Sequence, residues 1–284
     1  MAGSPPAGHE PARGKLFCGI DIGASATKLV LIDDRLQDVA RSVRHSGVDY
    51  AATAQSCLDD ALEQCGGGDD GDDSDDSVVA DTISTGYGRD NVEFASKQHT
   101  EIHCHAVGCY HLIQKPMTVI DIGGQDNKII HIGEGGQRKN FRMNRKCAAG
   151  TGAFVEEIAL RLGLGVGDLD QLAASTDDSV TLGSFCTVFS KTEILAHLRQ
   201  GAAVEQIVRG AFESVVTRIV EMDTFDGEIV FTGGVAAHNP TIARLLSARL
   251  GREVTVPPHP QFTGALGAAI LAHRAHQHPE DQDA

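Results

Sequence analysis

The sequence predicts an α/β protein of two lobes in which one design is used twice. In this design an apolar strand ends in Asp-Ile-Gly, makes a glycine turn and returns as a second strand, first at 15–33 and again at 117–132. The copies begin about 100 residues apart, which is typical of an internal duplication. The chain of 284 residues, 41 % of them apolar, is large enough for two cores.

In the first lobe, the patterns at 15–23 and 27–33 predict the two strands of a hairpin. Residues 51–64 have the apolar spacing of a helix, and residues 78–86 predict a further strand. Between them, the run 66–77 contains six Asp residues among Gly and Ser. This composition cannot form a packed core, so it predicts a surface loop.

The organisation restarts near Pro116, where we place the lobe boundary. Strands at 117–124 and 127–132 open the second lobe, and a third glycine turn follows a strand at 228–232. Helical patterns cover 151–162, 190–200, 203–222 and 263–272. The expected parts are a disordered extension (1–14), an N-terminal lobe with the acidic loop (15–115), a C-terminal lobe (116–265), and a closing helix with a polar tail (266–284).

The composition argues against several classes of function. The net charge is −15, and such a chain lacks the basic stripe that nucleic-acid binding needs. No stretch approaches the roughly 18 apolar residues that span a bilayer. The N-terminus lacks the apolar segment of a signal peptide. We therefore expect a cytoplasmic protein, in which the seven cysteines are reduced thiols or metal ligands rather than disulfides.

Both Asp-Ile-Gly turns carry groups that suit a magnesium–phosphate ligand. Asp21 and Asp121 offer carboxylates to hydrated Mg²⁺, and Ser25 and Thr27 add hydroxyls. Backbone amides of glycine turns can face phosphate oxygens. Two such hairpins, facing each other from two lobes, would hold MgATP in the cleft between them.

The sequence has neither a Gly-x-x-x-x-Gly-Lys-[Ser/Thr] loop nor Gly-x-Gly-x-x-Gly after its first strand. Its turns, with TGGV at 232–235 and TGALG at 263–267, resemble those of the acetate and sugar kinase, heat-shock protein and actin superfamily. The resemblance implies two ribonuclease-H-like lobes that close on ATP. It implies that Gly233 and Gly234 contact adenosine near Asn239, and that Gln125 or Asp126 positions water or metal at the terminal phosphate. The expected site comprises catalytic Asp21, Asp121, Gln125 and Asp126, with nucleotide contacts at Gly23, Ser25, Thr27, Lys28, Gly123, Gly124, Gly233, Gly234, Asn239 and Gly264.

Cys147 and Cys186 each precede a predicted helix start. Thr151 opens an apolar helical pattern, and Ser190 with Glu193 forms a Ser-x-x-Glu capping box. Helix N-termini carry partial positive charge, which stabilises a thiolate ligand. Two ligands are half of the four cysteines that a cubane cluster or a structural zinc takes, so a twofold dimer would supply the rest. The alternative is that both cysteines are small buried hydrophobic residues.

Five segments narrow the resemblance to one family. DIGGQD at 121–126, NRKCAAGTG at 144–152, CTVFS at 186–190, TGGVA at 232–236 and QFTGALGA at 261–268 resemble the CoA-substrate-specific activases, over about residues 15–273. These are ATP-dependent activators of 2-hydroxyacyl-CoA dehydratases and ATPase subunits of benzoyl-CoA reductase. The resemblance implies a homodimer with one [4Fe-4S] cluster between its subunits, with Cys147 and Cys186 as the metal ligands. The departures are the N-terminal extension, the acidic loop, and Ala24 where a hydroxyl residue is common.

The expected function is therefore ATP hydrolysis coupled to electron transfer, with ATP, Mg²⁺ and the cluster as cofactors. A ferredoxin or flavodoxin-like protein would donate the electron, and a dehydratase or reductase component would receive it. One alternative is the ATPase subunit of a stable aryl-CoA reductase complex. Others are a small-molecule kinase of the same superfamily and a nucleotide-gated scaffold like actin.

Three further groups of residues have structural interpretations. Segment 99–111 holds two cysteines and four histidines, but their spacing matches no standard zinc site. The basic run at 138–146 is a solvated strand face, or else a surface that docks an acidic partner or offsets cluster charge. Cys18, Cys57 and Cys65 lie in strand or helix patterns and are expected to be structural.

Overall fold

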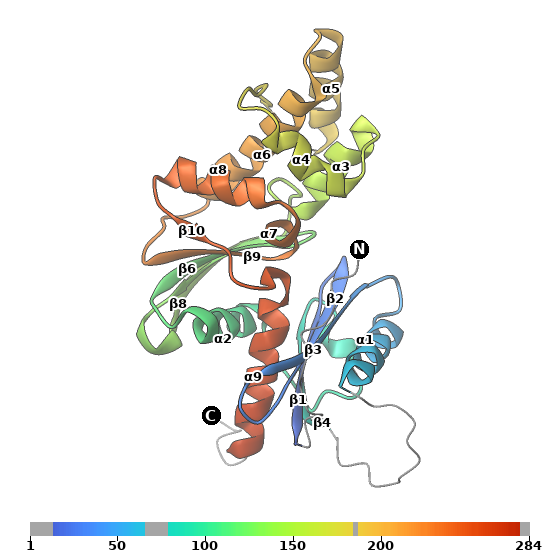
Figure 1. The fold of residues 1–284 in the computed structure, drawn as a ribbon, viewed down its shortest axis with the longest axis vertical. Coiled ribbons are helices and arrows are strands. Elements are labelled where there is room, and N and C mark those ends of the chain that lie inside the picture. Colours follow the sequence, from blue (N-terminus) through green and yellow to red (C-terminus); the bar gives the residue numbers. More distant parts are fainter. Residues whose placement is uncertain (1–13, 66–78, 184–186, 279–284) are drawn as a thin grey trace.

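The structure, a computed structural model, describes residues 14–65, 79–183 and 187–278. The acidic run 66–77 and Cys186 lie outside these ranges, as does the predicted N-terminal extension except for Gly14. The described residues form two five-stranded sheets with helices on both faces of each. Figure 1 shows the second sheet above the first, with helices α3 to α6 beyond it.

The two sheets have the same strand order. The first, β3-β2-β1-β4-β5, contains β1 (Leu16–Ile22), β2 (Ala26–Ile32), β3 (Asp38–His45), β4 (Val79–Gly86) and β5 (Lys97–Gln98). The second, β8-β7-β6-β9-β10, contains β6 (Met117–Ile122), β7 (Asn127–Ile132), β8 (Arg138–Asn144), β9 (Glu228–Thr232) and β10 (Val254–Thr255). In each sheet the first three strands in chain order pair antiparallel, and the last two join in parallel. This repeated plan confirms the duplicated, ribonuclease-H-like fold.

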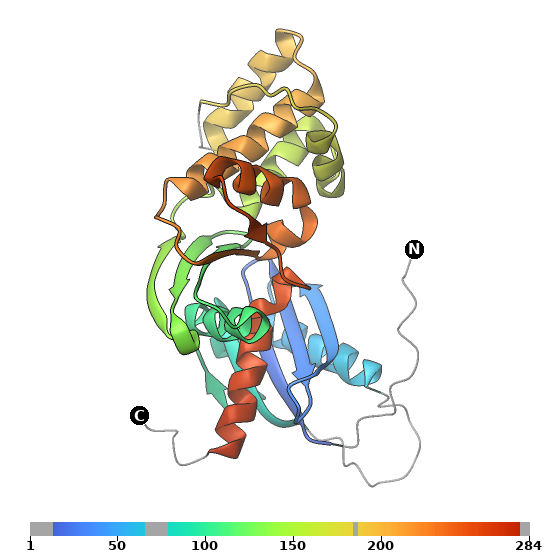
Figure 2. The ribbon, with the colours of Figure 1, turned by 60° about the vertical axis from the view of Figure 1, so that its left-hand side comes forward.

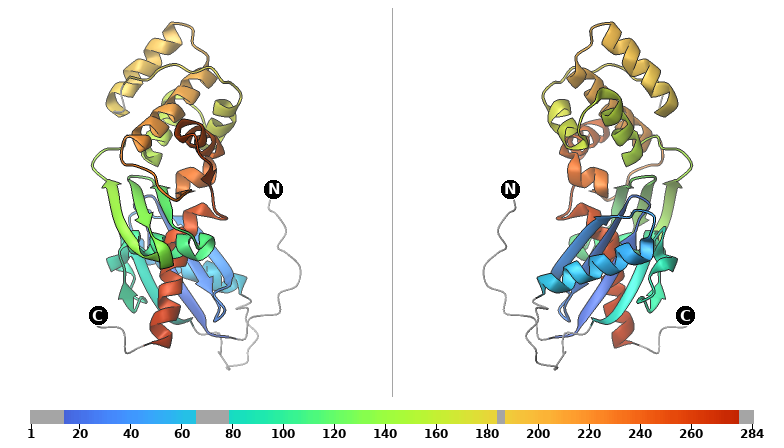
Figure 3. Two further views of the ribbon diagram at one scale, coloured as in Figure 1. Left: turned by 90° about the vertical axis from the view of Figure 1, so that its left-hand side faces the viewer. Right: turned by 90° about the vertical axis from the view of Figure 1, so that its right-hand side faces the viewer.

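Helices cover both faces of each sheet, which is why the central strands are apolar on both sides. The helices are α1 (Tyr50–Gln64), α2 (Glu101–Ile113), α3 (Gly152–Leu162), α4 (Leu169–Ala174), α5 (Thr187–Arg199), α6 (Val204–Val220), α7 (Gly234–His238), α8 (Pro240–Leu250) and α9 (Thr263–Gln277). On the first sheet, α1 packs on one face and α9 on the other (Figure 3). On the second, α2 packs on one face, and the group containing α3, α6 and α8 packs on the other.

The helices α2 and α9 cross in backbone contact between the sheets (Figure 2). A Cβ added to Gly108 of α2 would lie 2.1 Å from the Thr263 carbonyl oxygen. One added to Gly267 of α9 would lie 1.8 Å from the Cys104 carbonyl oxygen. Such distances are far below van der Waals contact, so only glycine fits at both positions. The predicted close packing of the small-residue helix at 263–272 is confirmed.

The predicted strands and helices are present, but one helix starts earlier than predicted. Helix α5 begins at Thr187, so Ser190 lies inside the helix and the predicted capping box is wrong. Residues three apart on a helix face each other in any turn, so the Ser-x-x-Glu spacing alone does not mark an end. Segment 101–113 is helix α2, in which the successive His103, Cys104 and His105 point in different directions. Among the described residues there is no cluster of His, Cys, Asp and Glu that could hold a metal.

Within the same ranges no helix is long and apolar enough to cross a membrane.

Candidate nucleotide site

The two glycine turns have the same backbone geometry. The amide of Gly23 donates to the carbonyl oxygen of Ala26 at 3.1 Å, and that of Gly123 donates to Asp126 at 2.9 Å. In both hairpins the acid before the turn is paired across the ladder with a lysine, Asp21 with Lys28 and Asp121 with Lys128. The duplication therefore extends to the charged residues beside each turn.

The parallel strand beside each acid ends in a glycine that is required there. Gly86, the last residue of β4, has φ +89°, and Gly233, directly after β9, has φ +95°. A Cβ at Gly86 would lie 2.4 Å from Asp21 Oδ1, and one at Gly233 would lie 2.9 Å from Asp121 Oδ1. Side chains other than glycine are both strained and obstructed at these positions. Each carboxylate thus lies against the bare backbone of the neighbouring strand.

The two turns contact each other across the molecule. A Cβ at Gly124 would lie 2.3 Å from Ser25 Oγ. Gly264 is the second residue of α9 and lies beside Asp21 and beside His105 of α2. A Cβ there would be 3.1 Å from Asp21 Oδ2 and 3.2 Å from His105 Nε2. Ser25 and Gly124 thus lie close together, and Asp21 lies beside Gly264, where α9 begins.

Asp121 lies in a buried network of charged and polar groups. Lys128 Nζ is 3.1 Å from Asp121 Oδ2, 2.8 Å from Asp126 Oδ1 and 3.5 Å from Glu101 Oε2. The other carboxylate oxygen of Asp121 accepts a hydrogen bond from Thr232 at 3.0 Å. The side chains of Asp121 and Lys128 are each 3 % exposed, so water contributes little to their solvation.

These contacts shift the pKa values of the buried groups. Burial works to raise the pKa of Asp121, but the charges of His105 and Lys128, with hydrogen bonds from Lys128 and Thr232, hold it below its usual range. Burial alone would lower the pKa of Lys128, yet the carboxylates of Asp121, Glu101 and Asp126 raise it. Burial raises the pKa of Glu101, and the charge of Lys128 acts against this rise.

His105 connects this network to α9. Its Nε2 lies 3.6 Å from Asp121 Oδ2, and its Nδ1 is hydrogen-bonded with Thr263 Oγ1 at 3.0 Å. The imidazole is buried, so it fills the space between Asp121, Asp21 and the first turn of α9.

The other expected contacts are distributed around the turns. Gln125 is exposed at the tip of the second turn, and Ser25 is half-buried in the first. The buried Thr27 hydroxyl is hydrogen-bonded with Ser46 Oγ at 3.0 Å. Gly234, at the start of α7, faces open space, whereas the Asn239 side chain is buried and donates to the Val235 carbonyl oxygen at 3.1 Å.

Hydrogen bonds join the second turn to the segment that contains Cys147. The amide of Gly152 donates to the Gly123 carbonyl oxygen at 2.9 Å, and the amide of Ala153 donates to that of Gly124 at 2.7 Å. Asn127 Nδ2 donates to the Gly150 carbonyl oxygen at 3.0 Å. Further along, Asn144 Nδ2 donates to the Cys147 carbonyl oxygen at 2.9 Å.

Comparison with known proteins identifies the family. Residues 18–272 match the BadF/BadG/BcrA/BcrD ATPase family. The chain belongs to this family. The activator of lactoyl-CoA dehydratase from Anaerotignum propionicum is 38 % identical over 91 % of this chain and 98 % of that protein.

Two solved structures of activators share the fold of this BadF/BadG/BcrA/BcrD-type ATPase. Component A of the (R)-2-hydroxyglutaryl-CoA dehydratase from Acidaminococcus fermentans is 36 % identical, with a TM-score of 0.84, over 93 % of this chain and 100 % of that one. The activator of 2-hydroxyisocaproyl-CoA dehydratase from Clostridium difficile was solved with bound ADPNP. It is 32 % identical, with a TM-score of 0.83, over 95 % of this chain and 98 % of that one. The family resemblance seen in the sequence is confirmed.

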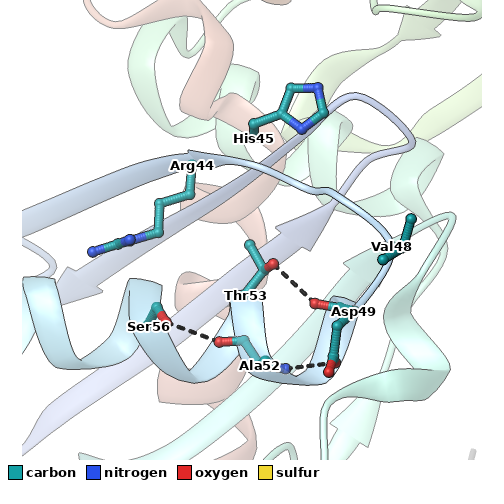
Figure 4. Close-up of a pocket in the computed structure, with 7 residues that line it drawn as sticks. All are labelled: Arg44, His45, Val48, Asp49, Ala52, Thr53 and Ser56. Atoms are coloured by element: carbon teal, nitrogen blue, oxygen red, sulfur yellow. Dashed lines mark hydrogen bonds between the residues drawn. The ribbon is translucent and has the colours of Figure 1, made fainter.

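A shallow pocket of about 510 Å³ lies in this ATPase beside the first turn, between the end of β3 and the start of α1 (Figure 4). It is lined by Arg44, His45, Val48, Asp49, Ala52, Thr53 and Ser56. One of its polar side chains is used by the helix, because Asp49 caps α1 by accepting from the Ala52 amide at 3.0 Å. None of the expected nucleotide contacts lines it, so the glycine turns are the candidate site of the family fold.

The sequence reasoning assigned no role in the site to Lys128, His105, Glu101 or Gly86. Lys128 could have been found, because it occupies the same place in the second repeat as Lys28 in the first. Gly86 similarly follows Thr85 as Gly233 follows Thr232, each pair ending the strand beside the acid. Glu101 and His105 have no equivalent in the repeat and are brought to the site by the packing of α2.

Proposed function

We propose that this protein is an ATP-dependent activator that delivers a low-potential electron to a 2-hydroxyacyl-CoA dehydratase or to a benzoyl-CoA reductase-type partner. It would act as a homodimer with one [4Fe-4S] cluster at the subunit interface and with a ferredoxin or flavodoxin-like donor. The observation that carries the proposal is the hydrogen-bonded connection between the second glycine turn and the Cys147 segment. Relatives that are named as dehydratase activators support the same reading.

The residues around the turns fit MgATP. No side chain in the described part of the chain forms a hydrogen bond or ion pair with the Asp21 carboxylate, although Asp21 is only 8 % exposed. A nearly buried carboxylate without a partner is costly, and a bound divalent cation would remove that cost. Asp21 would therefore hold Mg²⁺, Gly233 and Gly234 would contact adenosine, and the exposed Gln125 would orient water at the terminal phosphate.

The described cysteines also fit a shared cluster. Cys147 is exposed, whereas Cys18, Cys57, Cys104 and Cys109 are buried and Cys65 is half-buried. Cys186 lies outside the described residues, immediately before the first residue of α5. These two thiols of each chain would hold the cluster, which, when bound, supplies one-electron chemistry at low potential.

The chain itself would connect nucleotide to cluster through the segment 149–153. If bound phosphates shifted the backbone at Gly123 and Gly124, the hydrogen bonds from Gly152 and Ala153 would carry that shift to the start of α3. Nucleotide can drive such a change only as far as it binds one arrangement more tightly than the other.

Anaerobic purification with iron analysis and visible spectroscopy tests the proposal. We expect about four irons per dimer and a spectrum that responds to MgATP. Fewer than about two irons per dimer, with no response to ATP, would reject it. Copurification of a dehydratase or reductase component at fixed stoichiometry would instead identify a permanent subunit.

A further inference from the structure

The repeated turns differ in one respect that the duplication does not predict. Each has an acid paired across the hairpin with a lysine. In the second turn, Lys128 Nζ lies 3.1 Å from Asp121, whereas no ion pair joins Lys28 to Asp21 among the described residues. Two sites built on the same backbone plan thus have different charge arrangements.

The Lys128 ammonium lies among the oxygen atoms of three carboxylate groups. Carboxylate oxygens of Asp121, Asp126 and Glu101 lie 2.8 to 3.5 Å from its ammonium, and its side chain is 3 % exposed. Three carboxylates at these positions are the ligand type that Mg²⁺ and Mn²⁺ prefer. The ammonium group lies between these carboxylates, and with it in place the described residues form no group that could hold a metal ion.

Stability alone gives little reason for this arrangement. A buried ion pair loses about as much in desolvation as it gains in attraction, and apolar replacements are often neutral. Lys128 also holds the Asp126 carboxylate, whose Oδ1 lies 2.8 Å from the ammonium and 2.7 Å from the place of a Cβ at Gly123. Gln125 is then the residue of this turn that is exposed to solvent.

We propose that the Lys128 ammonium is the built-in cation of the second glycine turn, held where a divalent ion would otherwise bind between Asp121, Asp126 and Glu101. Lys128 is thus a positioning residue: it fixes Asp121 and Asp126 as a scaffold and leaves the Mg²⁺ of the nucleotide to Asp21. The metal role of Asp21 rests on the proposed function, whereas the cation role of Lys128 does not require nucleotide. Under this proposal Asp121 does not contribute to the Mg²⁺ site that the sequence predicts for both acids.

The test counts Mn²⁺ bound to the dimeric protein by the loss of the free-ion EPR signal, first without nucleotide and then with ADP. Lys128→Met should bind about one additional Mn²⁺ per chain in both conditions, because its removal frees three carboxylates. Lys128→Arg keeps the cation and should bind no more than the native protein. Lys28→Met is the matched control from the first repeat, used without nucleotide because Lys28 is an expected nucleotide contact, and it should likewise gain no ion.

A native Mn²⁺ count for Lys128→Met without nucleotide would overturn the proposal. If this variant is too unstable to titrate, its melting temperature is measured with and without Mn²⁺. The proposal then requires that Mn²⁺ raise the melting temperature of Lys128→Met well above any shift in the native protein. Equal shifts in both proteins would overturn it. Failure of native protein to bind ADP would reject the proposed function but leave the nucleotide-free comparison valid.

Discussion

The Gly152 amide donates a hydrogen bond to the Gly123 carbonyl oxygen at 2.9 Å. This contact joins the first residue of α3 to the second glycine turn. Five residues before Gly152 lies Cys147, the exposed thiol that we expect to hold the cluster. One short backbone contact thus lies between the two sites that the proposed function must couple.

Enlarging Gly152 should weaken this coupling. A Cβ there would lie 3.1 Å from the Gly123 oxygen and from Gly124 Cα, so Gly152→Val should separate the two segments at a cost of about 1–3 kcal/mol in stability. We expect iron content and ADP binding to remain while the spectral response to MgATP falls. Gly167→Val is the control, because a Cβ at Gly167 meets no atom within 4 Å. A full response in Gly152→Val would show that the contact does not couple the sites.

The cysteine assignment is tested by single substitutions. Cys147→Ser and Cys186→Ser should each reduce iron from about four to below about one per dimer, because a cubane needs four thiolates. ADP affinity, measured by calorimetry, should stay within about threefold of native protein, since neither residue belongs to the glycine turns. Cys65→Ser serves as the control and should keep its iron. Loss of ADP binding with iron retained would contradict the assignment.

The glycines beside the two acids should be essential for nucleotide binding. Gly86→Ala and Gly233→Ala each place a methyl group against Asp21 or Asp121 and strain the backbone at positive φ. We expect each to lose about tenfold or more in ADP affinity, with about 1–3 kcal/mol of stability. Gly47→Ala provides the comparison, because Gly47 has φ +61° but open space around its Cβ position. Its stability should fall while its ADP affinity is kept; equal affinity losses in all three would refute a role in the site.

The pKa of Asp121 predicts a defined dependence of stability on pH. Its folded value is below the ordinary Asp value of 3.8, so its ionised form adds stability that is present above this value. That stability is lost as the pH falls toward the folded value. Urea unfolding from about pH 6 to 3 should therefore show the native protein and Asp121→Asn converging in free energy of unfolding below about pH 4. A gap that widens on acidification would mean that Asp121 is not held ionised.

Local pattern predicted much of the candidate site. Asp21, Gly23, Asp121 and Gly123 lie at the ends of apolar strands, where the sequence marks both the strand and its turn. The capping box predicted at Ser190 is wrong, because α5 begins at Thr187. A Ser-x-x-Glu spacing also occurs inside helices, so it does not fix the residue at which a helix begins.

Residues that reach the site through packing were not predictable in this way. His105 is 158 residues from its hydrogen-bond partner Thr263, and Thr232 is 111 residues from Asp121. The periodicity of a single sequence does not indicate which residues so far apart in the chain will be in contact.

The sequence by itself determined the repeated hairpins and the acids beside their turns. Strands and glycine turns depend on residues that are close together in the chain, so local sequence patterns predict them. Only the tertiary structure decided which acid has a partner. Helix α2 brings Glu101 and His105 to Asp121, while Asp21 is left without an ion pair among the described residues. The physical reason is that charge compensation depends on distance in space, and two identical Asp and Lys pairs diverge once different helices pack beside them.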